Sequence, residues 1–352
     1  MSYVAPRWLP GPHAQTIWPA VVAPRAQVRY QRVRWSTPDG DFIDLDFALG
    51  QTAADAIPDT GADDLATQAI GSRDDERPLL VLFHGLEGNS SSHYATAMMA
   101  AALRRGWRAA VVHFRGCSGE PNLAPRAYHS GDSDEIDWVL RRFSDQLARR
   151  APLFAVGVSL GGNALAKWLG ERGSQAQFVT AAAAICAPHD LQAGALALSQ
   201  GFNRVYTANF LKSLKTKSLE KLTRYPQLFD RERMLAARDF FDFDDAVTAP
   251  MHGFRSCYDY WERSSCRSFL AGIRTPTLLI NARNDPFVPA GVLAQATQVS
   301  EQVQLEYPDQ GGHVGFVSGG FPGRFEWIPA RVLGFLSEQP HTNSQAPGPL
   351  HG

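Results

Sequence analysis

The stretch Leu153-Phe-Ala-Val-Gly-Val-Ser-Leu-Gly-Gly-Asn-Ala-Leu165 passes from an apolar run, through a serine flanked by glycines, into a segment of helical composition. Ser159 stands in the pattern G-x-S-x-G, with Gly157 and Gly161 on either side. Small residues there allow a sharp strand-to-helix turn, which lifts the hydroxyl off a sheet and points a helix N-terminus at it. The stretch therefore predicts an α/β architecture with Ser159 as a candidate nucleophile.

Short apolar runs alternate with helical segments on both sides of this turn. Strands are expected at 79–83, 107–114, 153–158, 179–185, 277–281 and 303–307, and helices at 93–105, 132–149, 164–169 and 330–336. Such alternation predicts a mostly parallel central sheet with helices on both faces. Two β-like runs, 28–35 and 42–47, flank the turn Pro38-Asp-Gly40 and predict an N-terminal antiparallel hairpin.

The chain is expected to form a single α/β domain over residues 1–338. Residues 190–270 break the alternation with Ala/Leu-rich, Lys-rich and aromatic pieces, which predicts a helical cap inserted above the sheet. Residues 50–77 are polar and acidic without aromatics, so we expect a mobile insertion loop there. Residues 339–352 are expected to be a disordered tail. The proline density of residues 1–25 argues against a long helix.

The composition excludes several classes of function. With 34 basic and 35 acidic residues the net charge is −1, which gives no reason to expect a nucleic-acid partner. The four cysteines form neither a C-x-x-C pair nor a zinc-like Cys/His spacing. No secretory signal and no run of 18 apolar residues is apparent, so a cytoplasmic protein with reduced thiols is expected. No metal, organic cofactor or obligate protein partner is expected.

A serine hydroxyl needs an adjacent base, which a third group orients. Two loops after predicted strands supply candidates in the order that this fold uses. Asp285 lies in Asn284-Asp-Pro286 after the strand at 277–281, and His313 lies among glycines after the strand at 303–307. Sites in open α/β sheets form at the carboxyl ends of strands. Asp285 is therefore the predicted acid and His313 the predicted base, with Asp190 as the alternative acid.

The segment His84-Gly-Leu-Glu-Gly88 follows the first parallel strand. Hydrolases of this fold stabilise an oxyanion with one backbone N–H from this loop and another from the residue after the nucleophile. The backbone amides of Leu86 and Leu160 are therefore the predicted oxyanion donors. The side chain of His84 is interpreted as structural, and Glu87 as either a loop cap or a substrate contact.

Three other patterns have competing interpretations. His129 and Asp134 match H-x-x-x-x-D, a pattern of some acyltransferases, but ordinary helix-start residues are favoured here. Cys117 is interpreted as a packing residue because Asp285 and His313 suit Ser159 better. Residues 210–222 mix leucines with lysines and predict an amphipathic helix. A solvated basic face is favoured over a peripheral membrane contact through this cap helix.

From residue 8 nearly to residue 336, the sequence resembles the YheT-like branch of the α/β hydrolases, which is related to the eukaryotic ABHD lipid esterases and phospholipases. The residues that carry the resemblance are Gly11-Pro-His-Ala-Gln-Thr-Ile-Trp-Pro19, Thr37-Pro-Asp-Gly-Asp-Phe-Ile-Asp-Leu-Asp46, His84-Gly-Leu-Glu-Gly88, Phe114-Arg-Gly-Cys-Ser-Gly119, Tyr128-His-Ser-Gly131, Gly157-Val-Ser-Leu-Gly-Gly-Asn163, Asn284-Asp-Pro-Phe287 and Gly311-Gly-His-Val-Gly-Phe316. Residues 50–77 look like an insertion relative to the family.

The resemblance implies an α/β-hydrolase fold and assigns nucleophile, acid and base to Ser159, Asp285 and His313. It implies hydrolysis of carboxylic esters, with short- to medium-chain acyl esters or glycerolipids as the small-molecule substrate. Two alternatives stay open. One is acyl transfer to an alcohol acceptor, which the pattern at His129 and Asp134 suggests, and the other is a non-catalytic lipid-binding protein of the same fold.

Overall fold

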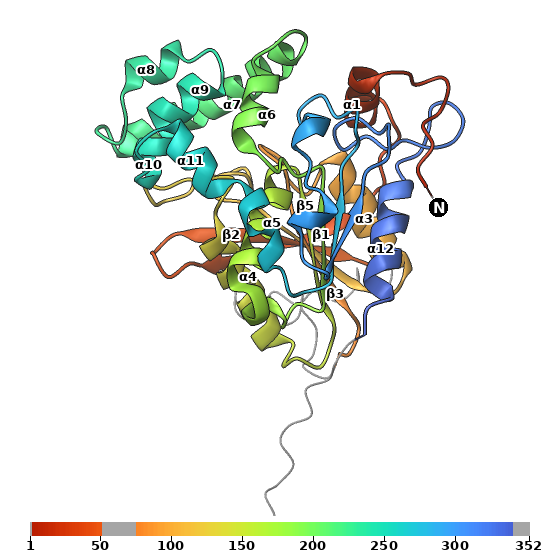
Figure 1. The fold of residues 1–352 in the computed structure, drawn as a ribbon. Helices are drawn as coiled ribbons and strands as arrows, with labels where there is room; N and C mark the ends of the chain where they lie inside the picture. The colour runs from red at the N-terminus through yellow and green to blue at the C-terminus, as the bar shows by residue number, and fades with distance from the viewer. Residues whose placement is uncertain (1, 51–74, 341–352) are drawn as a thin grey trace, which may run out of the picture.

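A computed structural model describes residues 2–50 and 75–340, and an eight-stranded sheet runs through its centre (Figure 1). The strands lie in the order β1-β2-β4-β3-β5-β6-β7-β8. Their bounds are β1 Arg29–Ser36, β2 Phe42–Leu49, β3 Leu79–Phe83, β4 Arg108–Val112, β5 Leu153–Val158, β6 Ala181–Ile185, β7 Thr277–Ile280 and β8 Val303–Glu306. All eight lie within three residues of the bounds expected from sequence.

The sheet is parallel from β4 through β8, and antiparallel where β1 pairs with β2 and β2 with β4. The predicted N-terminal hairpin is thus present, and it extends one edge of the parallel sheet. Parallel pairing aligns the carboxyl ends of β5, β7 and β8 at one edge, where the loops that follow them meet. The predicted fold class is confirmed.

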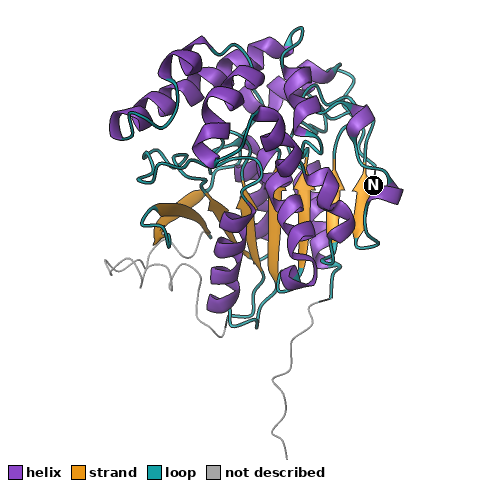
Figure 2. Ribbon diagram, turned by 60° about the vertical axis from the view of Figure 1, so that its left-hand side comes forward, coloured by secondary structure: helices purple, strands orange, loops and turns teal. Residues whose placement is uncertain are grey.

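Helices cover both faces of the sheet (Figure 2). α4 and α5 pack on one face and α3 and α12 on the other, with bounds α3 His93–Arg104, α4 Ser133–Gln146, α5 Leu160–Arg172 and α12 Trp327–Ser337. In β3, Val81 packs toward α4 and α5, while the adjacent Leu82 packs toward α3 and α12. Successive side chains of a strand point to opposite faces. A strand buried on both faces is therefore expected to be apolar throughout, as β3 is.

The predicted helical cap lies between β6 and β7, above one end of the sheet (Figure 1). Its helices are α6 Leu191–Leu198, α7 Asn203–Arg224, α8 Arg231–Ala236, α9 Phe240–Phe243, the π-helix η3 Asp244–Thr248, α10 Ala249–His252 and α11 Cys257–Ser264. Leu211, Met234 and Phe243 belong to a small apolar cluster within the cap. The cap therefore has a core of its own and can present one helix, α7, to the sheet domain. Short 3₁₀ helices complete the described chain: η2 Gly173–Ala176, η4 Cys266–Gly272, η5 Ala290–Val292 and η6 Ala296–Gln298.

The N-terminal segment contains a ten-residue helix, α1 Pro12–Val21, which was not predicted, although it is not the long helix that the prolines argue against. Pro12 stands in its first turn, where the missing N–H has no partner in any case, and Pro19 lies near its end. Apart from residues 50, 75–77 and 339–340, the predicted mobile loop at 50–77 and tail at 339–352 fall outside the described residues. No helix within 2–50 and 75–340 combines the length and apolar character needed to span a membrane.

Candidate active site

Ser159 occupies a strained turn between β5 and α5. Its φ of 52° and ψ of −117° are dihedrals that non-glycine residues rarely adopt. Gly157 and Gly161 permit the close approach of strand and helix: a Cβ on Gly157 would lie 2.4 Å from the Gly161 carbonyl oxygen, and one on Gly161 would lie 2.5 Å from that of His84. The Ser159 N–H donates to the Ile185 carbonyl at 2.8 Å. The hydroxyl thus stands at the carboxyl end of β5, as the motif predicts.

The structure brings Ser159, Asp285 and His313 into one chain of hydrogen bonds. His313 Nε2 lies 2.9 Å from Ser159 Oγ, and His313 Nδ1 lies 2.8 Å from Asp285 Oδ2. A carboxylate can only accept, so Nδ1 carries the proton and Nε2 is left to accept from the serine hydroxyl. The Asp285 side chain is buried, and its Oδ1 accepts the N–H groups of Phe287 at 2.8 Å and Val288 at 3.2 Å. These bonds orient the carboxylate.

The alternative acid Asp190 and the pattern of His129 and Asp134 have partners outside the candidate active site. Asp190 caps helix α6, where its carboxylate accepts a backbone N–H at 3.0 Å. Asp134 forms an ion pair with Arg172 at 2.6 Å, and its side chain is 89% exposed. His129 packs instead against His252, with 4.5 Å between ring centroids. The pattern of His129 and Asp134 therefore does not assemble into a second acid–base pair.

Helix α1 holds the loops that carry the acid and the base. Gln15 Oε1 accepts the side-chain N–H of Asn284 and the backbone N–H of Gly311, each at 2.9 Å. Thr16 Oγ1 accepts the backbone N–H of His313 at 2.9 Å. Gln15 is 1% exposed and Thr16 8% exposed. Both side chains are thus buried hydrogen-bond acceptors for loops on which the histidine and the aspartate lie.

No role for Gln15 or Thr16 follows from the sequence alone. Both belong to the stretch at 11–19, and the loops that they hold lie 269 to 297 residues farther along the chain. The available signal was the pair of adjacent polar residues in a stretch that the family resemblance had already singled out. The pattern could not reveal their partners, because hydrogen bonds over such separations depend on packing.

Cys186 lies beside the acid and the base, and ligand atoms of Cys186, Asp285 and His313 lie within 4.8 Å of one another. Burial raises the pKa of the Cys186 thiol well above its ordinary value, so the sulfur stays protonated. A neutral thiol is a weak metal ligand. Its Sγ instead accepts the N–H of Val314 at 3.3 Å, next to the histidine. These three residues are therefore better suited to supporting the loop that carries the base than to binding a metal ion.

The loop at 84–88 lies on the other side of the serine. A Cβ on Gly85 would lie 3.2 Å from the Cβ of Ser159, so the loop packs directly against it. Within the described part of the chain, the backbone N–H groups of Leu86 and Leu160 donate no hydrogen bond. The first amides of a helix have no acceptor within it, which explains Leu160. Two unpartnered donors next to a serine suit the stabilisation of a developing oxyanion.

The side chain of His84 supports this loop. Burial lowers its pKa to about 3, so the ring is neutral. Its Nε2 accepts the N–H of Phe114 at 3.1 Å, and its Nδ1 lies 2.7 Å from the carbonyl oxygen of Gly85. Both ring nitrogens are thus engaged with backbone, which agrees with the structural interpretation from sequence.

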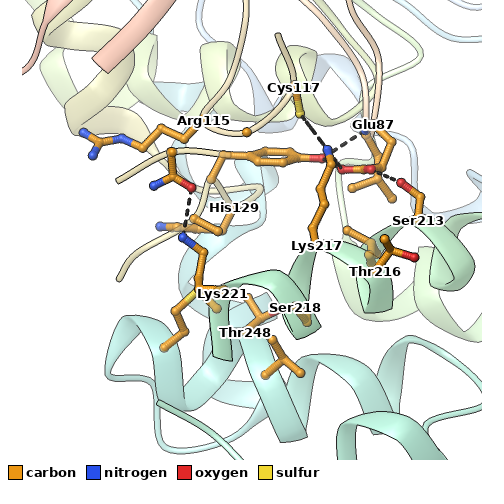
Figure 3. Close-up of a pocket in the computed structure, with 18 of the residues that line it drawn as sticks. Glu87, Arg115, Cys117, His129, Ser213, Thr216, Lys217, Ser218, Lys221 and Thr248 are labelled. Carbon is orange, nitrogen blue, oxygen red and sulfur yellow. Dashed lines mark hydrogen bonds and ion pairs between the residues drawn. The ribbon is translucent and has the colours of Figure 1, made fainter. Parts of the chain in front are cut away.

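A cavity of about 970 Å³ lies between the cap and the sheet domain (Figure 3). Its walls include Leu86 and Leu160. The residues that carry both candidate oxyanion donors therefore border the cavity, while Ser159, Asp285 and His313 are not among its lining residues. Apolar side chains of the cap line part of it, among them Phe240, Phe243, Val247 and Met251. Polar side chains of α7 line another part. Such a mixed cavity can hold a molecule with an apolar chain and a polar end.

The predicted solvated basic face of the helix at 210–222 is wrong for three lysines. Lys215 Nζ donates to two carbonyl oxygens within the cap, at 2.6 and 2.8 Å, and the other two lysines contact the sheet domain. Lys217 forms an ion pair with Glu87 at 2.8 Å, and Lys221 Nζ donates to the side-chain oxygen of Asn122 at 2.9 Å. Lys212 is exposed, as expected. For Lys217 and Lys221, the physical reason is that α7 lies across loops of the sheet domain that present oxygen acceptors to it. The basic face thus joins the cap to the sheet domain.

Comparison with known proteins agrees with this architecture. A family model described as the alpha/beta hydrolase fold matches residues 78–320. The chain is 37% identical over 329 residues to "Putative esterase YheT" of Escherichia coli, covering 92% of this chain and 90% of that protein. It is 27% identical to "Phospholipase ABHD3" of Mus musculus, covering 91% and 74%. The structure of the Pyrococcus furiosus esterase Pf2001 superimposes with a TM-score of 0.52 at 14% identity, covering 91% and 99%, a likeness of fold alone.

Proposed function

The chain belongs to the α/β-hydrolase family, and we propose that within it the protein is a serine hydrolase of carboxylic esters. The observation that carries this proposal is the hydrogen-bonded chain from Ser159 Oγ through His313 to Asp285, at 2.9 and 2.8 Å. A nucleophile, a base and an orienting acid in that geometry are the requirements for covalent acyl transfer.

In the proposed acylation, His313 Nε2 takes the hydroxyl proton as Ser159 Oγ bonds to the ester carbonyl carbon. The carbonyl oxygen becomes an oxyanion, which the N–H groups of Leu86 and Leu160 stabilise. Asp285 stabilises the imidazolium and holds its orientation. The imidazolium then protonates the leaving alkoxide as the carbon–oxygen bond breaks, and the acyl group remains on the serine.

In the proposed deacylation, water takes the place of the alcohol. His313 removes a proton from water as its oxygen attacks the acyl carbon, and the same two N–H groups stabilise the second oxyanion. Collapse returns the proton to Ser159 Oγ and releases a carboxylic acid. These residues complete the reaction with no cofactor.

Short- to medium-chain acyl esters or glycerolipids are the proposed substrate class. The mixed apolar and polar lining of the cavity supports an amphiphilic ester, and relatives named esterase and phospholipase support the same class. Hydrolysis is preferred over acyl transfer because Asp134 is paired with Arg172 rather than with His129. A cytoplasmic location and a membrane contact through the cap stay predictions.

The test compares Ser159→Ala with the wild type on a series of p-nitrophenyl esters of increasing acyl length. Loss of the nucleophile is expected to lower kcat by at least about 10⁴-fold and to abolish labelling by a fluorophosphonate probe. Ser199→Ala, on the cap surface, is the matched control and should keep both. A folded Ser159→Ala protein with normal turnover would overturn the proposal.

Two further arms separate the alternatives. A transferase is distinguished from a hydrolase by adding an alcohol acceptor and measuring the ratio of acylated alcohol to free acid. If the protein is a hydrolase, free acid dominates in water. A wild-type protein that neither turns over any ester nor labels with the probe would favour the non-catalytic lipid-binding alternative.

A further inference from the structure

Glu87, the residue after the candidate oxyanion donor Leu86, has an unusual environment for a glutamate. Its backbone φ is 56°, in the left-handed region that non-glycine residues seldom occupy. Its side chain is only 10% exposed. A carboxylate taken out of water must be compensated by charge and hydrogen bonds. The conformation and the burial both require partners, and these come from two parts of the molecule.

The first partner belongs to the sheet domain. Tyr128 accepts the backbone N–H of Glu87 at 2.9 Å through its hydroxyl oxygen, and the same hydroxyl donates to Glu87 Oε1 at 2.8 Å. The tyrosine ring stacks on Phe114, with centroids 5.3 Å apart and planes 6° apart. One rigid side chain therefore holds both the backbone and the carboxylate of Glu87.

The other partners belong to the cap (Figure 3). Lys217 Nζ lies 2.8 Å from Glu87 Oε1, and the Ser213 hydroxyl donates to Glu87 Oε2. Lys217 and Ser213 are four residues apart on α7 and so share a face of that helix. Lys217 Nζ also lies 3.4 Å from the sulfur of Cys117 in the sheet domain. One face of the cap helix thus holds the carboxylate next to the oxyanion loop.

The electrostatics support a firm contact. Burial by itself would lower the pKa of Lys217, yet Cys117 and Glu87 facing its ammonium hold that pKa above its ordinary value. Lys217 is therefore charged when the cap is in place. Removing one partner of a partly buried ion pair leaves the other charge uncompensated, which is more costly than the loss of one ordinary hydrogen bond.

The loop geometry connects this cluster to the candidate oxyanion hole. The N–H of Gly85 donates to the Tyr94 hydroxyl at 2.9 Å, and the N–H of Glu87 donates to the Tyr128 hydroxyl at 2.9 Å. The amides on both sides of Leu86 are thus fixed, and the Leu86 N–H between them meets no acceptor among the residues that the structure describes. The Leu86 N–H lies in the Gly85–Leu86 peptide plane, so a shift of Glu87 reaches it through the backbone dihedrals of Leu86.

We propose that Glu87 is a positioning residue, through which Lys217 and Ser213 of the cap helix aim the Leu86 amide at the oxyanion. The proposal rests on the hydrolase function proposed above. It means that the cap does more than wall the substrate cavity: the contacts of Lys217 and Ser213 with Glu87 complete an alignment of the oxyanion donor that tyrosines of the sheet domain begin. An amphiphilic ester that fills the cavity and holds the cap down would then favour its own turnover.

The experiment measures kcat and KM for a p-nitrophenyl ester, and Ki for an aryl trifluoromethyl ketone, which forms a tetrahedral oxyanion on the serine. Loss of an oxyanion donor costs about 10²–10³-fold in kcat, so a misdirected donor is expected to cost about tenfold. Lys217→Met and Glu87→Gln should each lower kcat by about tenfold and raise Ki by a similar factor, with KM within about twofold. The double variant should lose no more than the worse single variant, because both substitutions break one contact.

Lys221→Met is the matched control. Lys221 lies one turn along α7, lines the same cavity and also joins the cap to the sheet domain, through carbonyl and amide oxygens at 122–126. Within residues 2–50 and 75–340, its hydrogen bonds go to the segment 122–126 and not to the oxyanion loop. Its loss is expected to act on KM, with the ratio of Ki to KM unchanged.

Unchanged kcat and Ki in both Glu87→Gln and Lys217→Met would overturn the inference, as would losses that multiply in the double variant. An effect of Lys221→Met on kcat and on the ratio of Ki to KM as large as that of Lys217→Met would overturn it too. Circular dichroism and thermal melting identify variants that fail to fold. If Glu87→Gln does not fold, Ser213→Ala and Lys217→Met test the same contact from the cap side. An enzyme that depends on Ser159 but is insensitive at these positions refutes this inference alone, whereas activity in Ser159→Ala refutes the proposed function and this inference with it.

Discussion

The two sides of Ser159 are supported in different ways. On the acid–base side, helix α1 holds the loops of Asp285 and His313 through neutral hydrogen bonds from buried Gln15 and Thr16. On the oxyanion side, the cap helix α7 reaches the loop of Leu86 through charged groups, with the side chain of Lys217 36% exposed.

The two kinds of contact support different parts of the candidate active site. The neutral contacts of Gln15 and Thr16 join segments that pack on the sheet domain. The cap also reaches the acid loop, where Asn203 of α7 donates to the Pro286 carbonyl at 2.6 Å, but this contact is neutral as well. The charged contact joins the sheet domain to an insertion, so the oxyanion geometry depends on where the cap sits. Neutral buried bonds tolerate changes in salt, while a pair with one partly exposed partner is weakened by it. The contact of α7 with Glu87 is therefore the place where a substrate in the cavity can alter the geometry of the oxyanion donor.

The largest expected effect lies on the acid–base side. Asp285→Asn should lower kcat by about 10⁴-fold while the protein stays folded, because an amide in this position favours the wrong histidine tautomer. Steady-state kinetics on a p-nitrophenyl ester measures the loss. Asp190→Asn is the control: asparagine caps a helix as well as aspartate does, so kcat should stay within about twofold. A large loss of kcat in Asp190→Asn and none in Asp285→Asn would make Asp190, and not Asp285, the acid.

A smaller effect is expected from the support of that side. Gln15→Ala removes the acceptor for Asn284 and Gly311 and leaves buried donors unpaired, which should cost about 1–3 kcal/mol of unfolding free energy. The base loop should also shift, lowering kcat by roughly 10- to 100-fold. Urea unfolding and kinetics measure the two effects. Ile17→Ala, on the exposed face of α1, should change neither the unfolding free energy nor kcat by much. An unchanged kcat in Gln15→Ala would contradict the role of Gln15 in holding the acid and base loops.

The smallest expected effect is the coupling between the two sides. Gln15 and Lys217 share no hydrogen-bond partner among the described residues. The kcat losses of Gln15→Ala and Lys217→Met should therefore multiply in the double variant, to within about twofold. The kcat losses of Glu87→Gln and Lys217→Met should not multiply, because both substitutions break one contact, and this pair serves as the comparison. A strong departure from multiplication for the first pair would show that cap and base loop move together.

Much of the fold could be predicted because its signals are local. The apolar run 153–158, the glycines around Ser159 and the Asp-Gly turn of the hairpin specify strand and turn within a few residues. Helix α1 was missed because proline density is evidence against helix interiors, while Pro12 stands at the start, where proline is tolerated. The basic face of α7 was misjudged because helical periodicity reports which residues share a face and not what that face meets.

The sequence by itself determined the candidate nucleophile, acid and base, since each stands at the end of a recognisable strand and parallel strands bring their carboxyl ends to one edge of the sheet. Only the tertiary structure decided what holds them. Gln15 meets a loop 296 residues away, and Lys217 meets Glu87 across 130 residues. Such contacts depend on how helices pack over loops, and the free energy of a buried polar group depends on the partner that packing supplies.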